Sequence, residues 1–210
     1  MTGRFITFEG GEGCGKSTQI RLLASRLKEA GREVLLTREP GGTALAERIR
    51  GLVREESTDP PNARAETLLF LASRAQLVAN VIRPALEAGT WVLCDRFSDS
   101  TLAYQGYGRG LDLETLRRLN AFATGGLVPD RTILLDVPPE VATARMRARE
   151  RLTHDAADRM EKAGEAFHLR LREGFLRLAA EDPGRIALIS AAGSIEEVAE
   201  AVWTSIRHML

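Results

Sequence analysis

Five short apolar runs limit the folds open to this chain of 210 residues more than any other feature. Each run is apolar almost throughout rather than at every second position, which is typical of strands covered on both faces. Segments with helical periodicity separate them. We therefore predict one α/β domain over 1–210, with a doubly wound five-stranded parallel sheet flanked by helices. The runs cover 5–10, 34–39, 91–96, 132–137 and 186–191.

Two of the intervening segments carry apolar stripes at helical spacing, which predict helices packed on the sheet. The stripes are formed by Ile20, Leu23, Ala24 and Leu27, and by Phe167, Leu171, Phe175 and Leu178.

The stretch GGEGCGKST lies between the first apolar run and the first helical segment. Its spacing G-x-x-x-x-G-K-S is that of a phosphate-binding loop, whose backbone N–H groups and following helix point positive charge at phosphate. Lys16 is expected to reach the outer phosphates and the Ser17 hydroxyl to bind Mg²⁺. The motif thus predicts ATP and magnesium and leaves the acceptor open. The expected nucleotide-binding residues are Gly10, Gly11, Glu12, Gly13, Cys14, Gly15, Lys16, Ser17 and Thr18.

Phosphoryl transfer also needs a carboxylate near the metal and arginines near the phosphates. Asp95 ends an apolar run and is a candidate for organising Mg²⁺ through water, with Arg96 beside it to hold an anionic group. Asp136 ends another run and competes with Asp95 for the metal, or caps the helix that follows. The sequence leaves this choice open.

Charge and cysteine usage exclude some classes of partner. Lys and Arg together number 29, as do Asp and Glu, so the net charge is zero and gives no field for long nucleic acid or an anionic membrane. No apolar run of 18 residues and no signal-peptide pattern is visible, and two cysteines give no disulfide framework. We expect a cytoplasmic protein with a small anionic ligand.

The segment 145–160 is rich in arginine. It is compatible with a solvated helix end or with a mobile lid that closes arginines over phosphates. Charge alone does not separate the two.

Five motifs together resemble those of bacterial thymidylate kinases, a family of P-loop nucleoside monophosphate kinases. In chain order they are FEGGEGCGKST, TREPGGT, LLFLASRAQ, CDRFSDSTLAYQGYGRG and PDRTILLDVPPE, and the likeness extends from Phe5 to the C-terminal helix. The resemblance implies transfer of the γ-phosphate of ATP to dTMP for dTTP synthesis. It also implies Mg²⁺ and a homodimer.

The resemblance assigns the base site. It implies that Phe70 stacks on the base and that Arg74 hydrogen-bonds a thymine carbonyl, whereas without it Phe70 would be taken for core and Arg74 for surface. By the same analogy, Thr101 lies near the base edge. Tyr104 and Gln105 then form the wall that excludes a ribose 2′-hydroxyl.

The resemblance also assigns the phosphate contacts. Arg96 would hold the monophosphate with help from Arg38 and Arg50, because a dianionic phosphate calls for several guanidinium groups. Glu12, a carboxylate in a loop built for anions, would contact the 3′-hydroxyl and help to position the acceptor.

The phosphate loop itself carries no arginine. This agrees with the bacterial type of the family, in which the resemblance implies that an arginine of the lid reaches the γ-phosphate. Arg159 matches that position best, with Arg149 and Arg151 as alternates.

Three rival classes remain. A deoxynucleoside kinase needs a base to activate a hydroxyl, and a nucleotide switch or binding module of the guanine type would carry an N-K-x-D segment, which the sequence lacks. A structural protein that merely retains the loop is disfavoured by the intact Lys16, Ser17 and Asp95.

Overall fold

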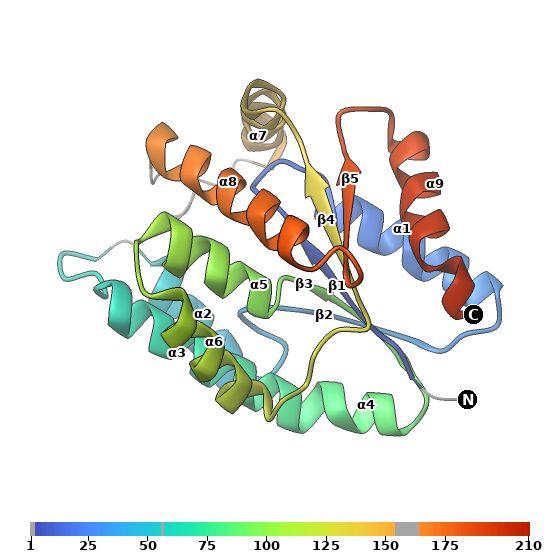
Figure 1. Cartoon of the computed structure of the whole chain (residues 1–210), viewed down its shortest axis with the longest axis horizontal. Coiled ribbons are helices and arrows are strands. Elements are labelled where there is room, and N and C mark those ends of the chain that lie inside the picture. The colour runs from blue at the N-terminus through green and yellow to red at the C-terminus, as the bar shows by residue number, and fades with distance from the viewer. Residues whose placement is uncertain (1–2, 56, 154–163) are drawn as a thin grey trace.

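The sheet of this protein is parallel, with strand order β2-β3-β1-β4-β5 (Figure 1). The computed structural model describes residues 3–55, 57–153 and 164–210, the last five residues of the second range as backbone only. Each strand lies within one residue of the run that predicted it. The strands are β1 (Phe5–Glu9), β2 (Val34–Arg38), β3 (Trp91–Asp95), β4 (Arg131–Asp136) and β5 (Ile186–Ser190).

Helices connect the strands in the alternation expected of a parallel sheet. Together with the strands they confirm the predicted fold class. They are α1 (Lys16–Glu29), α2 (Ala44–Arg54), α3 (Ala63–Leu77), η1 (Val78–Ile82), α4 (Arg83–Glu87), α5 (Ser98–Thr101), η2 (Leu102–Gly108), α6 (Leu113–Thr124), α7 (Pro139–Thr153), α8 (Glu165–Glu181), α9 (Ile195–Ile206) and η3 (Arg207–Met209).

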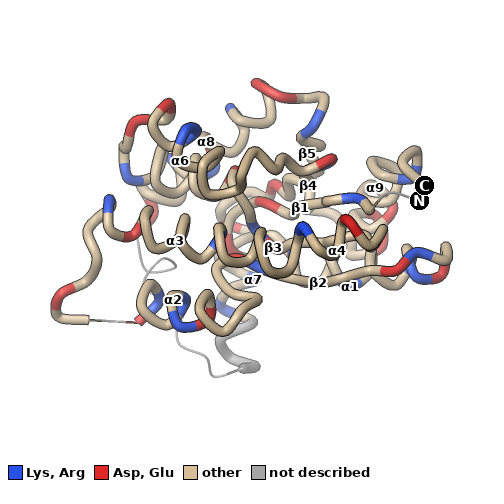
Figure 2. Tube along the Cα trace, turned by 90° about the horizontal axis from the view of Figure 1, so that it is seen from below, with Lys and Arg blue, Asp and Glu red and all other residues tan. Residues whose placement is uncertain are grey.

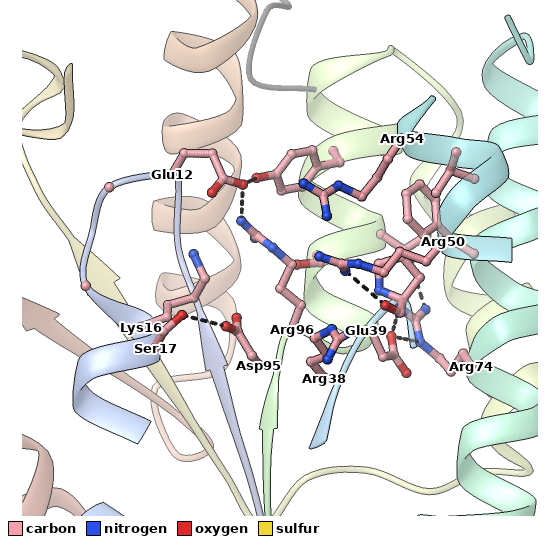
Figure 3. A pocket seen from close by; sticks show the side chains of 18 of the residues that line it. Glu12, Lys16, Ser17, Arg38, Glu39, Arg50, Arg54, Arg74, Asp95 and Arg96 are labelled. Carbon is pink, nitrogen blue, oxygen red and sulfur yellow. Dashed lines mark hydrogen bonds and ion pairs between the residues drawn. The ribbon is translucent and has the colours of Figure 1, made fainter. Parts of the chain in front are cut away.

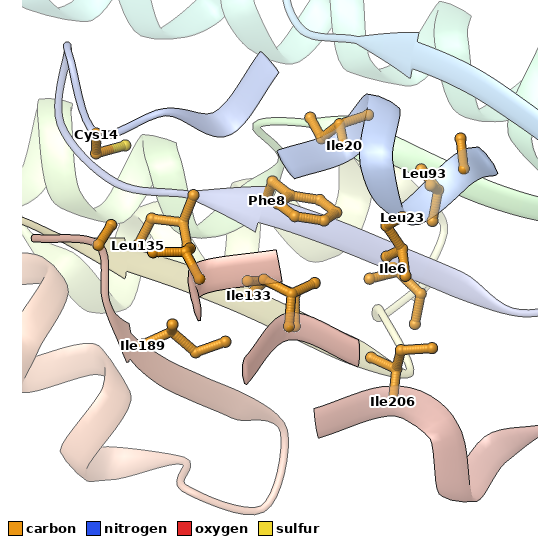
Figure 4. Packing of buried hydrophobic residues seen from close by; sticks show 14 of the residues in the cluster. Ile6, Phe8, Cys14, Ile20, Leu23, Leu93, Ile133, Leu135, Ile189 and Ile206 are labelled. Carbon is orange, nitrogen blue, oxygen red and sulfur yellow. The ribbon is translucent and has the colours of Figure 1, made fainter. Parts of the chain in front are cut away.

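Side chains on both faces of the central strands β3, β1 and β4 are buried, which explains why these strands are apolar almost throughout, whereas the edge strands β2 and β5 are partly exposed. On β1, Ile6 and Phe8 pack on one face under α1 and α9 (Figure 4). Phe5 packs on the other face beside η1 and the start of α5. The predicted helical stripes also face the core, since Leu27 of α1 and Leu171 of α8 are buried with their neighbours along each stripe.

Helices α2, α3 and α6 each begin at a residue whose side chain caps them. Thr43 and Asn62 accept hydrogen bonds from the first turns of α2 and α3, and Asp112 does the same for α6. Such caps satisfy backbone N–H groups that the helix itself leaves unpaired. The start of each of these helices is therefore set by local sequence.

The helical stretch Ala63–Glu87 is long and apolar enough to cross a membrane by length and composition. Its residues Glu66 and Arg74, however, bond to other elements of the same chain. That is the behaviour of a core helix in a globular domain. Positive and negative residues are interspersed along the described chain (Figure 2), as the zero net charge predicts.

Candidate active site

A cavity of about 850 Å³ lies at the carboxyl ends of the strands, where a parallel sheet places its ligands (Figure 3). The Gly-rich loop after β1 forms one wall. Side chains from α2, α3, α5 and η2 form the other wall, and arginines stand between the two. The cavity thus has a phosphate-binding end and an end lined partly by aromatic rings.

The Gly-rich loop needs glycine at two positions for steric reasons. Gly10 has φ 133° and Gly13 has φ 71°, both in the region that favours glycine. A Cβ on Gly10 would lie 2.4 Å from the carbonyl oxygen of Leu135, and one on Gly13 would lie 2.6 Å from that of Ala142. Lys16 folds over this loop and donates from Nζ to the carbonyls of Gly10 and Gly11 at 3.1 and 2.9 Å.

Ser17 and Asp95 face each other at the phosphate end. The Ser17 hydroxyl donates to Asp95 Oδ2 at 3.4 Å, and no group in the described part of the chain donates to the buried Oδ1 of Asp95. Asp136 is engaged differently, because Arg172 of α8 donates to both of its carboxylate oxygens at 2.7 and 2.8 Å. The geometry therefore favours Asp95 over Asp136 as the carboxylate available to a metal.

Arg96 lies at the centre of the cavity in a left-handed backbone conformation, φ 70°, which is uncommon for a residue other than glycine. Its guanidinium donates to Glu12 Oε1 at 2.5 Å and to the Gly10 carbonyl at 3.0 Å. The Tyr104 hydroxyl also donates to Glu12 Oε1, at 3.3 Å, and burial keeps the pKa of that hydroxyl well above its usual value. Glu12 thus joins the phosphate loop to Arg96 and Tyr104.

Two further arginines line the cavity, one at the end of β2 and one in α2. Arg38 makes a two-pronged ion pair with Glu47 of α2, and Arg50 of α2 donates to the Pro40 carbonyl at 3.0 Å. With Arg96 they place the three predicted phosphate-binding arginines around one cavity.

The far end of the cavity contains Phe70 and Arg74, four residues apart on α3. Phe70 is half-buried in the cavity wall, not in the core. Arg74 is only 2% exposed, and its five N–H groups make five hydrogen bonds within the protein, so contact with a ligand would have to replace one of them. The bonds go to Glu39 Oε2 twice, Thr101 Oγ1, Asn120 Oδ1 and the Phe97 carbonyl.

Thr101, Tyr104 and Gln105 line the same end from the opposite side. They lie in α5 and η2, a helical segment whose later turns have the wide π form that recurs at functional sites. All three are buried.

A buried carboxylate, Glu9, ties the two halves of the site together. It ends β1 directly before the phosphate loop. It accepts hydrogen bonds from the N–H groups of Phe97 and Ser100 and from the Ser100 hydroxyl, at 2.8, 3.2 and 2.6 Å. Burial, with repulsion from Asp99, raises the pKa of Glu9 from 4.5 to about 7.

Comparison with known proteins identifies the family. The thymidylate kinase family model matches residues 8–202. The thymidylate kinase of Synechococcus sp. (strain JA-2-3B'a(2-13)) is 54% identical over 98% of this chain and 95% of its own. That of Rhizorhabdus wittichii is 51% identical over the full length of both. A crystal structure of thymidylate kinase from Ehrlichia chaffeensis superposes with TM-score 0.79 at 34% identity, covering 98% of this chain and all of that one.

The chain belongs to the thymidylate kinase family. The resemblance inferred from five motifs is thereby confirmed, as are the P-loop fold and the prediction that the protein is a kinase.

Within the family fold, the described residues bring together most of the predicted site, including Lys16, Ser17, Asp95 and Arg96. Cys14 is buried beside Lys16, and Gly11 offers its carbonyl to Lys16. The predicted lid over 145–160 is described only to Thr153, where 145–153 form the end of α7. Arg159 and the side chains of Arg149 and Arg151 lie outside the described residues.

Sequence reasoning missed several residues of the site. Glu39 and Arg54 line the cavity, and Arg145 reaches it from α7. Glu39 belongs to the REPGG motif, so the sequence contained a signal that could have identified it as a site residue. Asn120, which holds Arg74 from α6, has no local signature, because only the packing of α6 against α3 brings it there.

We predict that Glu9→Gln changes the pH dependence of stability. Between pH 4.5 and 7 the folded protein holds a proton on Glu9 that the unfolded chain has released, so this residue lowers stability as pH rises through that window. The loss is complete above about pH 7 and amounts to about 3 kcal/mol. Glutamine retains an acceptor for the two N–H groups and removes the charge.

The measurement is the free energy of unfolding in denaturant from pH 4 to 8. The advantage of Glu9→Gln over the parent should grow from near zero at pH 4.5 to its full value near pH 8. Glu114→Gln, on an exposed glutamate of α6, serves as the control and should run parallel to the parent. A constant offset between Glu9→Gln and the parent at every pH would contradict the assignment.

Proposed function

We propose that this chain transfers the γ-phosphate of ATP to dTMP with the help of Mg²⁺, giving dTDP and ADP for dTTP synthesis in the cytoplasm. Phosphorylation of dTMP with ATP follows from membership of the family. The residue roles, the metal and the assembly state are our proposal. The observation that carries it is the single cavity in which a phosphate loop faces Phe70 across a group of arginines.

On the ATP side, the backbone N–H groups of the loop and the start of α1 hold the phosphates, and Lys16 turns from the loop carbonyls to the outer phosphates. Ser17 and Asp95 fit a magnesium ion, because the Ser17 hydroxyl lies against Asp95 and one buried Asp95 oxygen has no donor within the described residues. A bound Mg²⁺ would neutralise negative charge on the phosphates of ATP.

On the acceptor side, Arg96 binds the 5′-phosphate of dTMP, with Arg38 and Arg50 as further contacts. In the free protein Glu12 holds the Arg96 guanidinium at 2.5 Å. This contact keeps the arginine extended toward the phosphate site before dTMP arrives. Glu12 then accepts a hydrogen bond from the 3′-hydroxyl, which fixes the acceptor for in-line attack of a phosphate oxygen on the γ-phosphorus.

At the base end, Phe70 stacks on the thymine ring and Arg74 acts at its carbonyl edge together with Thr101. Tyr104 and Gln105 occupy the space beside the sugar where a ribonucleotide carries its 2′-hydroxyl. The Tyr104 ring packs against Phe167 and Phe175, with ring centroids 6.1 and 6.3 Å away, so it has a rigid backing for this exclusion.

The reaction is tested by ADP release with Mg·ATP and, in parallel, dTMP, dUMP, thymidine, UMP and CMP. We expect strong turnover with dTMP and rejection of UMP by the Tyr104 wall. Turnover with thymidine alone would show that the phosphate is transferred to a hydroxyl group, and it would contradict the roles proposed for Arg38, Arg50 and Arg96 in binding the acceptor phosphate. Slow hydrolysis that no acceptor changes would indicate a nucleotide switch.

We keep 145–160 as the lid and Arg159 as the arginine that reaches the γ-phosphate. Arg159→Ala should lower kcat by about 10³-fold or more, because an arginine in this role stabilises charge only in the transition state. The dTMP affinity, measured by titration calorimetry, should stay nearly unchanged. Arg149→Ala tests the first alternate, and its loss of kcat should be much smaller than that of Arg159→Ala. Full activity of Arg159→Ala, or an equal loss of affinity and kcat, would discard the assignment.

We also propose a homodimer formed through α2, α3 and α6. Neighbouring helices there expose large apolar side chains, among them Leu52, Leu68 and Phe122, the last 88% exposed. Such exposure is typical of an interface. Light scattering should give twice the chain mass of 23.0 kDa, and Phe122→Glu should shift the protein toward the monomer. A monomeric parent at micromolar concentration would refute the dimer.

A further inference from the structure

Glu66 of α3 is a buried carboxylate outside the cavity that the proposed mechanism does not use. It is 0% exposed and lies one helical turn before Phe70 and two turns before Arg74 on the same helix. Gln105 donates from Nε2 to Glu66 Oε1 at 2.9 Å, and Arg109 donates to Glu66 Oε2 at 3.3 Å and to Oε1 at 3.5 Å. Burying a charge is costly, so its retention calls for a reason.

The contact with Glu66 fixes which way the Gln105 amide points. A carboxylate paired with an arginine only accepts hydrogen bonds, so it must receive the NH₂ group of the amide. The carbonyl oxygen of Gln105 takes no part in this contact with Glu66. Gln105 is 2% exposed and lines the cavity, and no donor to this oxygen is present in the part of the chain that the structure describes. Gln105 therefore offers the cavity an acceptor.

Thr101, one turn before Gln105, has the opposite polarity. Its hydroxyl oxygen accepts from Arg74 Nη1 at 2.9 Å, and Arg74 is held in place by Glu39 at 2.6 Å. The hydroxyl proton thus points away from Arg74. Because Thr101 lines the same cavity, it offers a donor beside the Gln105 acceptor.

A donor beside an acceptor matches one kind of pyrimidine edge. The C4 carbonyl and N3–H of thymine or uracil present an acceptor beside a donor, whereas the C4 amino group and N3 of cytosine present the reverse. We propose that Glu66 is the positioning residue that makes the site select a keto pyrimidine over an aminopyrimidine, by locking the Gln105 carbonyl toward the base. This inference rests on the proposed placement of the dTMP base at this end of the cavity.

Glu66→Gln tests the inference because it should reverse the Gln105 amide. Arg109 can only donate, and its shorter contact is to the Oε2 position. The carbonyl of the new glutamine is therefore expected at that position, which leaves its NH₂ facing Gln105. Gln105 must then turn its own carbonyl toward position 66 and its NH₂ toward the cavity. Cytosine N3 gains a donor, and thymine N3–H meets another donor.

The readouts are kcat and KM for dTMP, and the inhibition constant of dCMP against dTMP. We expect Glu66→Gln to raise the KM for dTMP and to lower the inhibition constant of dCMP. The ratio of the KM for dTMP to the inhibition constant of dCMP should therefore rise by about 10-fold or more, while kcat stays within a few-fold of the parent. Glu181→Gln is the control for the charge change, since it removes an arginine-paired carboxylate that is exposed and lies outside the cavity. It should leave the ratio unchanged.

A double-mutant cycle tests whether Glu66 acts on selectivity through Gln105. In a Gln105→Met background, Glu66→Gln should produce no further change in the ratio. Three outcomes would overturn the proposal. The ratio could be unchanged in Glu66→Gln, both nucleotides could bind equally more weakly, or the full shift could persist in the Gln105→Met background. If Glu66→Gln fails to fold, Gln105→Met alone must lose discrimination against dCMP, and retention would overturn it. Parent turnover with dTMP in the same assay tests the proposed function separately.

Discussion

The hydrogen bonds of the Glu9 carboxylate are the constraint on which the site depends. One carboxylate at the end of β1 holds the N–H groups of Phe97 and Ser100, which follow β3, while its own backbone leads into the phosphate loop. The two segments to which we assign phosphate binding therefore share one anchor. Arg96 lies between them in a left-handed conformation, which such surrounding bonds are needed to maintain.

Three buried glutamates act on the site without lying at its reacting centre. Glu9 fixes a loop, Glu39 fixes the plane of Arg74, and Glu66 fixes the amide of Gln105. Burial raises the pKa of Glu39, and the Arg74 guanidinium opposes that rise. Buried charges are expensive, but once paired they hold dipoles and cations in one orientation before the ligand arrives. Preorganisation of this kind is what phosphoryl transfer needs, because catalysis there is mostly positioning and charge stabilisation.

The sequence predicted the strands to within one residue and most of the cavity, but it left some choices open. The central strands were predictable because burial on both faces makes them apolar almost throughout, and the partly exposed edge strands carry the same apolar pattern. Asp95 and Asp136 were indistinguishable, since each ends an apolar run, and Arg172 on a later helix separates them. The buried environment of Arg74 was not predictable either, because its five hydrogen bonds go to four residues that lie far from it in the sequence.

The sequence by itself determined the parallel sheet, the phosphate loop and the family, because these depend on residues close together in the chain or on motifs in a fixed order. Glu66, Phe70 and Arg74 even share a helix face by spacing alone. Only the tertiary structure decided what that face meets. The polarity of Gln105 and Thr101 depends on hydrogen-bond partners that lie 39 and 27 residues away, and a donor or acceptor role exists only once such partners are in contact.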